Sequence, residues 1–447
     1  MKSLLSKPPW LLIVLFSAAV AGQGIGTADA PPRLVTQKCT AQGGCARRNT
    51  SLVLDASFHG LRAKDGGSGN NDSVAGGRAN SSCGGGFDGA PLSKALCPDA
   101  ETCARNCVLD GAEYAGNGVL PVEGDGGVVL RQYMEREDGS VERVSPRVYL
   151  LDDQEEEEGE RNYEMLFLKS QEISFDVDVS KLVCGMNGAL YLAEMNETGA
   201  RGGLNPAGAR YGTGYCDAQC PKLPFINGVA NIESRGSCCT EMDLWEANAF
   251  AAAFTGHTCS EPGQYACAGG ECGALGVCSK SGCEYNTYRL GNKTFYGDSV
   301  DTSRPFTVTT QFLTNTGDAA PGAILNEIRR LYVQDGRVIA NPAVADPYMP
   351  PGDSIKMSHC QASVAGTFEN LGGLRQMGRA LDRGMVLVAR IWNDDAAFMN
   401  WLDAGDSGPC SATEGDPKLI AEKHADTQVA FSNIRWGDIG STYTATG

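Results

Sequence analysis

Three carboxylates lie within one short segment, residues 238–248, which reads CCTEMDLWEAN. Glu241, Asp243 and Glu246 are interleaved with apolar side chains and follow two adjacent cysteines. Carboxyl groups held close together cannot all ionise cheaply, so at least one retains its proton to a higher pH. Such a group can supply a carboxylate nucleophile and a carboxylic acid at the same pH. The segment therefore predicts combined nucleophilic and acid/base chemistry.

Strand geometry decides whether these three side chains can meet. Side chains alternate between the faces of a strand, so Glu241 and Asp243 share a face and Glu246 has the opposite parity. A β-bulge that inserts one residue after Asp243 would return Glu246 to their face. The two glutamates could then approach to the roughly 5–5.5 Å that a retaining glycosidase requires. The alternative is an acidic strand edge on the surface, which the interleaved apolar residues and the cysteines argue against.

The elements that must position this segment are predicted to be strands. Short β-rich runs recur at residues 147–151, 164–168, 172–179, 189–195, 306–313, 385–392 and 428–436. The third run, EISFDVDV, alternates apolar and polar residues with the period of a half-buried strand. Asp335-Gly336 predicts a two-residue hairpin turn, and residues 374–383 are the best helical signal. We expect an all-β protein, an antiparallel β-sandwich of the jelly-roll kind, with residues 23–447 as one domain.

Composition excludes several classes of function. The 447 residues carry 37 basic and 54 acidic side chains, a formal charge of −17, which disfavours binding to nucleic acid or to an anionic membrane surface. A content of 42% hydrophobic residues excludes intrinsic disorder. The 57 glycines indicate many tight turns rather than long solvated helices. The acidic run at residues 152–160 is interpreted as a solvated hairpin tip rather than a calcium site.

The N-terminal residues predict secretion. Residues 1–22 have a basic start, a short apolar run and small residues before a cleavage site after Ala21 or Gly22, as a signal peptide does. No second hydrophobic span follows, so we expect an extracellular protein. All 18 cysteines lie after residue 22 and can form nine disulfides. Zinc binding by the 216–239 cysteines is disfavoured by that oxidising compartment. Five sequons, at Asn49, Asn71, Asn80, Asn196 and Asn292, are typical of a glycoprotein.

With these motifs the chain resembles glycoside hydrolase family 7, secreted cellulases that cleave β-1,4-glucan with retention. The resemblance covers about residues 34–442. Its markers, beside CCTEMDLWEAN, are GTGYCDAQCP (212–221), FDVDVS (175–180), NGALYL (187–192), MVLVARIWND (385–394) and FSNIRWGDIGST (431–442). The resemblance implies that Glu241 is the nucleophile, Glu246 the general acid/base, and Asp243 the partner that orients Glu241. It implies no metal and no organic cofactor.

The resemblance also implies a disulfide pairing and a cleft. The pairs are Cys39–Cys45, Cys83–Cys107, Cys97–Cys103, Cys184–Cys410, Cys216–Cys239, Cys220–Cys238, Cys259–Cys278, Cys267–Cys272 and Cys283–Cys360. Trp392 and Trp401 match sugar-stacking tryptophans on either side of the cleavage point. Other residues at family positions that line the cleft are Arg147, Asn187, Tyr191, Tyr215, Asp217, Gln219, His257 and, on the product side, Arg289. Trp436 and Trp245 are interpreted as core residues.

Loop lengths favour an endoglucanase with an open cleft across the concave sheet. Only six residues separate Asn231 from Cys238, and six separate Asp403 from Cys410, where processive cellobiohydrolases have long tunnel-forming insertions. A tryptophan pair at the tunnel entrance is replaced by residues 57–60, SFHG. The alternatives are a cellobiohydrolase, which Arg289 and the 259–283 loop resemble, and a non-catalytic glucan-binding lectin. The expected partner is cellulose or a related β-1,4-glucan, bound by a monomer.

Overall fold

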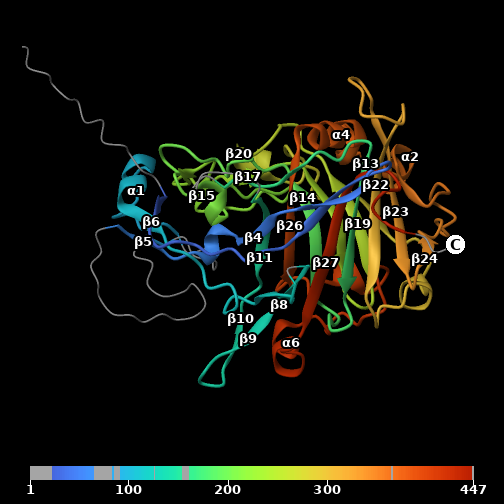
Figure 1. The fold of residues 1–447 in the computed structure, drawn as a ribbon, viewed down its shortest axis with the longest axis horizontal. Helices are drawn as coiled ribbons and strands as arrows, with labels where there is room; N and C mark the ends of the chain where they lie inside the picture. Colours follow the sequence, from blue (N-terminus) through green and yellow to red (C-terminus); the bar gives the residue numbers. More distant parts are fainter. Residues whose placement is uncertain are drawn as a thin grey trace, which may run out of the picture.

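Strands with one apolar face build the molecule. The computed structural model describes residues 23–64, 83–84, 91–124, 126–153, 161–363 and 366–444. In the strand β13 (Gln171–Asp178), Ile173, Phe175 and Val177 are buried against Leu190 and other side chains of a facing sheet. Two large sheets pack face to face in this way. The smaller elements β5 (Leu61–Ala63), β6 (Cys107–Leu109) and α1 (Ala100–Asn106) lie together at one end of the molecule, on the left of Figure 1. The predicted all-β sandwich is confirmed.

The first sheet has eight strands and carries the CCTEMDLWEAN segment. Its order is β21 (Cys283–Asn286), β19 (Ala252–His257), β18 (Glu241–Ala247), β14 (Asn187–Ala193), β26 (Met385–Trp392), β11 (Arg147–Asp152) and β4 (Thr50–Leu54), with β12 (Met165–Leu166) beside β26. All of these pairs are antiparallel. Residues of one face, such as Leu190 and Leu192, enter the core between the sheets, whereas Ala189 and Tyr191 point to the other face.

The second sheet has ten strands and closes the core. Its order is β24 (Arg337–Ala340), β23 (Leu325–Gln334), β22 (Phe306–Thr314), β13, β27 (Gln428–Asp438), β2 (Thr36–Thr40) and β3 (Gly44–Arg48), with β25 (Ser354–Lys356), β8 (Gly127–Arg131) and β7 (Val119–Pro121) attached. The pair β2 and β27 is parallel and the others are antiparallel.

The remaining elements are short. The small strands are β1 (Gly24–Ile25), β5 (Leu61–Ala63), β6 (Cys107–Leu109), β9 (Tyr133–Glu135), β10 (Val141–Arg143), β15 (Phe225–Ile226), β16 (Val229–Ala230), β17 (Gly236–Cys238) and β20 (Tyr265–Cys267). The α-helices are α1 (Ala100–Asn106), α2 (Met357–Ser363), α3 (Thr367–Asn370), α4 (Gly373–Arg383), α5 (Asn400–Asp403) and α6 (Pro417–Lys423). No helix among the described residues is long and apolar enough to cross a membrane.

Local predictions can be compared with these bounds. The predicted helix is α4, which ends where Gly384 adopts a positive φ of 92°. Asp335 and Gly336 both have positive φ, 52° and 74°, as the predicted hairpin turn between β23 and β24 requires. The run at 164–168 forms only the two-residue β12, because the chain leaves the sheet at the exposed Phe167 and turns at Ser170. The acidic residues 154–160, the signal segment 1–22 and two sequons, Asn71 and Asn80, lie outside the described residues.

The predicted bulge is present in β18. Asp243 pairs with Tyr191 of β14 and Trp245 pairs with Leu190, so Leu244 is the extra residue. The pairing with β19 shifts over the same interval. Leu244 and Trp245 both enter the core between the sheets and are completely buried. Because two consecutive side chains point inward, the next one, that of Glu246, points outward again.

A buried arginine of the opposite sheet holds this bulge. Arg330 of β23 is 1% exposed and donates a hydrogen bond from Nη2 to the carbonyl of Leu244. Its guanidinium lies 4.4 Å from the ring centroid of Phe254 and 5.8 Å from that of Trp245. A bulge leaves a ladder carbonyl without its strand partner, and a buried unsatisfied carbonyl is costly. Arg330 supplies the missing donor.

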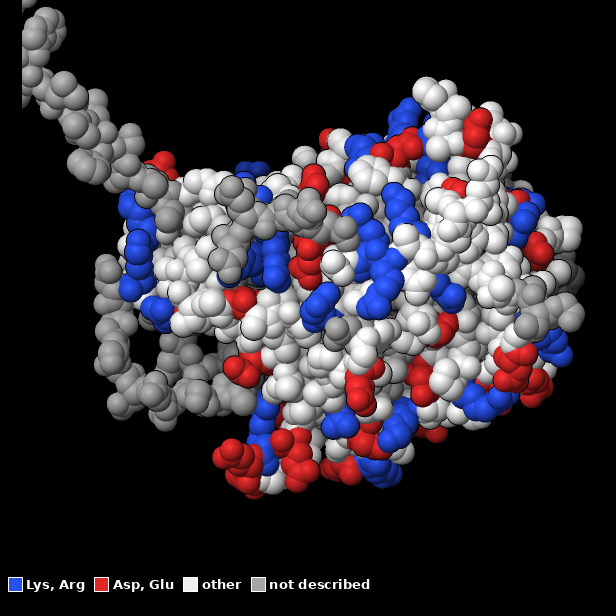
Figure 2. Space-filling model, in the orientation of Figure 1, with Lys and Arg blue, Asp and Glu red and all other residues white. Residues whose placement is uncertain are grey.

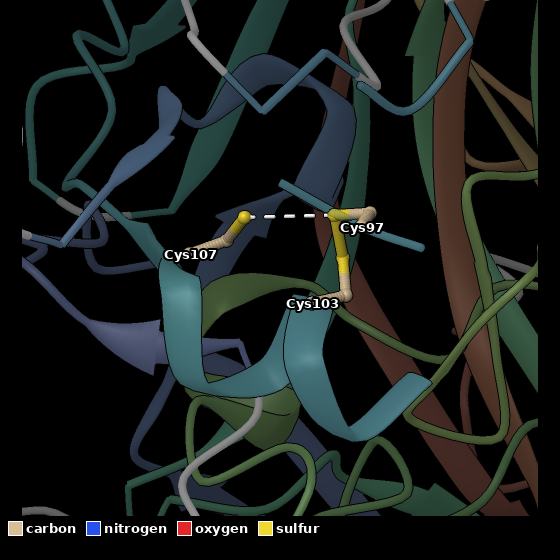
Figure 3. A group of neighbouring side chains, drawn as sticks. All are labelled: Cys97, Cys103 and Cys107. Atoms are coloured by element: carbon tan, nitrogen blue, oxygen red, sulfur yellow. Dashed lines mark hydrogen bonds between the residues drawn. A yellow bond between two sulfur atoms is a disulfide. The ribbon is translucent and has the colours of Figure 1, made fainter. Parts of the chain in front are cut away.

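All nine predicted disulfides are present, and no cysteine is free. The predicted pairing is therefore confirmed in full. Cys97, Cys103 and Cys107 gather at α1, where Cys97 Sγ lies 3.7 Å from Cys107 Sγ (Figure 3). Such a group has metal-binding geometry. Each of its sulfurs is already bonded in a disulfide, so none is a thiolate that could ligate zinc.

The contact between Arg330 and the bulge leads to a prediction. Arg330→Met removes the donor to the Leu244 carbonyl, so β18 should open more often and its amide hydrogens should exchange about tenfold faster. Hydrogen exchange of β18 peptides, followed by mass spectrometry, measures this. Arg329→Met is the matched control, because Arg329 directly precedes Arg330 in the strand and pairs with Glu327 rather than with the bulge. Unchanged protection of β18 in Arg330→Met would contradict the role of this hydrogen bond.

Candidate active site

A cavity of about 710 Å³ lies over the face of the eight-stranded sheet that points away from the core. Side chains of β11, β14, β18, β19, β21 and β26 line it, so it crosses the sheet from strand to strand. Ser281, Glu284 and Arg289 also border a second cavity, of about 400 Å³, that reaches Asp346 and Met349. The two cavities adjoin at these three shared residues, and together they are called the cleft.

The bulge brings the three carboxylates into this cleft. Glu241, Asp243 and Glu246 all line the cavity. Without the bulge, the alternation of side chains along the strand would place Glu246 in the core. Glu241 Oε2 accepts a hydrogen bond of 3.0 Å from the backbone N–H of Ala218. Glu246 Oε1 accepts one of 2.9 Å from Asn187 Nδ2. The two glutamates therefore have separate donors that hold them in place.

His257 lies behind the middle carboxylate. Its Nε2 is 3.1 Å from Asp243 Oδ2, and its Nδ1 is 2.9 Å from the carbonyl oxygen of Ser279. Both partners are acceptors, so the doubly protonated ring fits this position. Burial opposes the charge, but the hydrogen bond and the charge of Asp243 raise the pKa of His257. When His257 is protonated, it forms a buried ion pair with Asp243 at the wall of the cleft.

Burial perturbs the acidity of all three carboxyl groups. Desolvation, with the charges of Asp243 and Asp217, raises the pKa of Glu241 well above its ordinary value. Desolvation also raises the pKa of Asp243, against the opposing effect of His257. Desolvation and the charge of Asp243 raise the pKa of Glu246 to about 8. These protons belong to the group as a whole, which retains at least one of them near neutral pH.

One wall of the cleft is a chain of hydroxyl and carboxyl groups. Tyr191 and Tyr215 share a hydrogen bond of 2.8 Å, and the Tyr215 hydroxyl donates to Asp217 at 2.7 Å. The guanidinium of Arg147 lies 3.5 Å above the Tyr215 ring and forms an ion pair of 3.0 Å with the buried Asp55. These side chains are fixed before any ligand arrives.

Aromatic rings and ion pairs form the other wall. The ring centroids of Trp392 and Trp401 lie 6.2 Å apart and are tilted by 34°. Arg390 covers Trp392 at 4.8 Å. Arg289 pairs with Glu284 and donates hydrogen bonds to the Trp401 carbonyl, at 2.8 Å, and to Ser407. The position of the Trp401 backbone therefore depends on Arg289.

The structure brings nearly all predicted site residues together. The cavity lining includes Glu241, Asp243, Glu246, Arg147, Tyr191, Tyr215, Asp217, Gln219, His257, Arg289, Trp392 and Trp401. Asn187 does not line the cavity; it is completely buried and binds Glu246 from below. Trp245 and Trp436 belong to the core, as predicted. Phe58 and His59, which stand in place of the tunnel-entrance tryptophans, are buried as well.

Sequence reasoning missed several lining residues. Lys280, Ser281, Glu284, Arg390 and Asp394 also face the cavity. Arg390 could have been found, because it lies two residues before Trp392 on the same strand and so shares its face. Lys280 and Ser281 lie in a loop with no periodic pattern. Only the tertiary structure places that loop at the cleft.

Comparisons with known proteins identify the family of this chain. The sequence model of the family described as "Glycosyl hydrolase family 7" matches residues 23–443. The chain belongs to this family. The endo-β-1,4-glucanase celB of Aspergillus oryzae is 52% identical over 428 residues, which cover 95% of this chain and 96% of that protein. The family-7 assignment rests on nearly the full length of both chains.

Solved structures place this family-7 chain among cellulases. The native structure of Humicola insolens endocellulase EGI superimposes with a TM-score of 0.84 at 43% identity and covers 94% of this chain and 100% of that one. A family-7 cellobiohydrolase of Daphnia pulex superimposes with a TM-score of 0.81 at 34% identity, covering 95% and 100%. The fold is shared with both kinds of family-7 enzyme.

The raised pKa of Glu246 makes folding stability depend on pH. The folded chain binds this proton more tightly than the unfolded chain, so the stabilisation is complete below about pH 4.5 and is lost as the pH rises through about 8. The melting temperature of the parent should therefore fall over this interval more steeply than that of Glu246→Gln, whose amide does not titrate. Scanning calorimetry across the interval measures both slopes. Glu261→Gln, at an exposed surface carboxylate, should keep the parent slope; identical slopes for all three proteins would contradict the prediction.

Proposed function

We propose that this chain is an endo-β-1,4-glucanase that hydrolyses internal bonds of cellulose with retention of anomeric configuration. The observation that carries the proposal is the Leu244 bulge, which returns Glu246 to the face of Glu241 inside the cleft. Family membership and relatives that are themselves endo-β-1,4-glucanases support it. The substrate class is a β-1,4-glucan. No metal or organic cofactor enters the proposal.

The roles of the carboxylates follow from their surroundings. Glu246, whose pKa is raised to about 8, is assigned the proton that the coupled group retains, and it donates this proton to the leaving glycosidic oxygen. Glu241 attacks the anomeric carbon and forms a glycosyl ester. Glu246 then removes a proton from the water that hydrolyses this ester. Asp243, paired with His257, orients and tunes Glu241 from the same face of β18.

The remaining lining residues are proposed to bind sugar. Glucose rings have apolar faces, on which Trp392 and Trp401 stack on either side of the cleavage point. Their equatorial hydroxyls meet planar polar groups near the nucleophile: Arg147, Tyr191, Tyr215, Asp217 and Gln219. Asn187 holds Glu246, His257 holds Asp243, and Arg289 contributes to the product side.

The endo mode is favoured over cellobiohydrolase action. The sequence identity is 43% to an endocellulase and 34% to a cellobiohydrolase, and the two alignments cover nearly the same share of this chain. The 403–410 segment is closed by a hydrogen bond from the Cys410 N–H to the Asp403 carbonyl, so it forms a tight turn rather than a long loop over the cleft. An open cleft admits the middle of a glucan chain.

Secretion is part of the proposal. Residues 1–22 are proposed to be removed as a signal peptide, leaving residues 23–447 as a single extracellular catalytic domain that acts as a monomer. Nine disulfides fit an oxidising compartment. The sequons at Asn49 and Asn196 are exposed, as glycan addition requires.

Acidic and basic side chains are mixed over one face, with acidic ones gathered near the hairpin β9–β10 (Figure 2).

The two glutamates should fail in different ways when changed. Glu246→Gln removes the acid, so hydrolysis of cellulose should fall about 10²–10⁴-fold, whereas an aryl cellobioside with a very good leaving group should still form the glycosyl ester. Glu241→Gln removes the nucleophile and should abolish both reactions. Release of the aryl alcohol and of reducing sugar measures the two activities. Full activity of Glu246→Gln on both substrates would overturn the assignment and favour a lectin with a contaminating enzyme.

The product profile should distinguish endo from exo action. We expect the viscosity of soluble carboxymethylcellulose to fall early, while few reducing ends have been released, because cuts fall at internal bonds. Viscometry run in parallel with a reducing-end assay measures this ratio. Cellobiose as nearly the sole product from the first minutes, with viscosity almost unchanged, would instead establish a cellobiohydrolase.

A further inference from the structure

Lys280 connects a loop beside the cleft to the segment that holds Glu241. Its side chain lines the cavity, and Nζ donates a hydrogen bond of 2.6 Å to the carbonyl of Ala218. Nζ also lies 2.9 Å from Cys220 Sγ. In the opposite direction, Gln219 Nε2 donates a hydrogen bond of 2.9 Å to the Lys280 carbonyl. The loop and the 217–220 segment are therefore joined at more than one point.

Ala218 is the residue that holds the proposed nucleophile. Its backbone N–H donates to Glu241 Oε2 at 3.0 Å, and its carbonyl is the acceptor of Lys280. The disulfides Cys216–Cys239 and Cys220–Cys238 fasten the segment on both sides of Ala218 to the start of the catalytic strand. Lys280 thus fixes the one backbone position from which Glu241 receives its hydrogen bond.

The charge of Lys280 is not neutralised by an ion pair. Arg147 pairs with Asp55 and Arg289 pairs with Glu284, but the Nζ partners of Lys280 within the described residues are a carbonyl and a sulfur. Burial lowers the pKa of Lys280, and the charges of Asp217 and Glu241 oppose that effect. The ammonium group therefore acts electrostatically on these two carboxylates.

Several other charged or titratable groups surround Glu241, and each belongs to the same electrostatic balance. They are Asp243, Glu246 and His257 on β18 and β19, Asp217 on the adjoining segment, Tyr191 and Tyr215 on one wall, and Arg147 and Arg390 on β11 and β26. Three of them are carboxyl groups that disfavour a second negative charge at Glu241. A nucleophile in this position needs a compensating cation and a fixed donor.

We propose that Lys280 is a positioning residue for glycosyl-ester formation: it anchors Ala218, and so Glu241, and its charge favours the ionised nucleophile. The inference rests on the proposed function, because it presumes that Glu241 attacks the sugar. Lys280 itself forms no bond to the substrate in this step. A carboxylate oxygen of Glu241 forms a bond to the anomeric carbon while the bond from that carbon to the glycosidic oxygen breaks, and the leaving oxygen takes the proton of Glu246.

The expected result of Lys280→Met follows from the sign of the charge. Without the ammonium, Glu241 holds its proton to a higher pH, so the acid limb of the pH–rate profile moves to higher pH. Under acidic conditions ester formation should slow about tenfold, the loss typical of one hydrogen bond from a charged donor. Lys280→Arg restores a charged donor and should recover most of the rate. Lys280→Gln retains a neutral donor and should show the shifted limb.

The test measures ester formation directly. A 2-deoxy-2-fluorocellobioside with a dinitrophenolate leaving group traps the glycosyl ester, and mass spectrometry of the Glu241 peptide reports the trapping rate at each pH. Lys222→Met, which removes an exposed lysine two residues after Cys220, is the control and should match the parent. Thermal unfolding of each variant accompanies the rates. If Lys280→Met does not fold, Lys280→Gln against Lys280→Arg gives the same comparison.

Three outcomes would overturn the proposal or its basis. Equal trapping rates and acid limbs for parent and Lys280→Met would show that Lys280 does not act on Glu241. An effect confined to a higher KM for longer glucans would make Lys280 a substrate contact instead. If the parent itself is not trapped at Glu241, the proposed function fails, and this result is distinct from failure of the Lys280 inference alone.

Discussion

The insertion of Leu244 into β18 is the constraint on which the site depends. Strict alternation along a strand would place Glu246 in the core between the two sheets, where its charge has no partner. With two consecutive residues, Leu244 and Trp245, turned inward, the strand satisfies the core and returns Glu246 to the cleft. The bulge leaves the Leu244 carbonyl without a partner in the neighbouring strand, and Arg330 of the opposite sheet donates a hydrogen bond to it. The catalytic geometry is thus tied to sandwich packing.

The second theme is the cost of keeping carboxylates out of water. Burial alone would protonate all three groups, so the fold surrounds each with a different partner: a backbone N–H for Glu241, a protonated imidazole for Asp243 and an amide for Glu246. These different partners separate the roles of chemically similar side chains. Disulfides on both sides of Ala218 keep the first of these partners in place.

The cleft itself is preorganised rather than formed on binding. Its tyrosine wall is held by Arg147 and Asp55, and its tryptophan wall is held by Arg289 through the Trp401 carbonyl. A long glucan gains little from each sugar, so rigid platforms that require no ordering on binding favour affinity. Ion pairs hold two of the cavity's cations, Arg147 and Arg289, whereas Lys280 and Arg390 have no ion-pair partner among the described residues.

Sequence alone determined the carboxylate motif, most of the longer strands, the Asp335-Gly336 turn and, by parity, the need for a bulge, because these depend on neighbours along the chain. The disulfide pairing came from family resemblance and not from spacing, which leaves many pairings open. Tertiary structure alone decided which donors meet the carboxylates and the bulge. Arg330 lies 86 residues from Leu244 and Lys280 lies 62 residues from Ala218, and no local pattern encodes contacts made between separate sheets and loops.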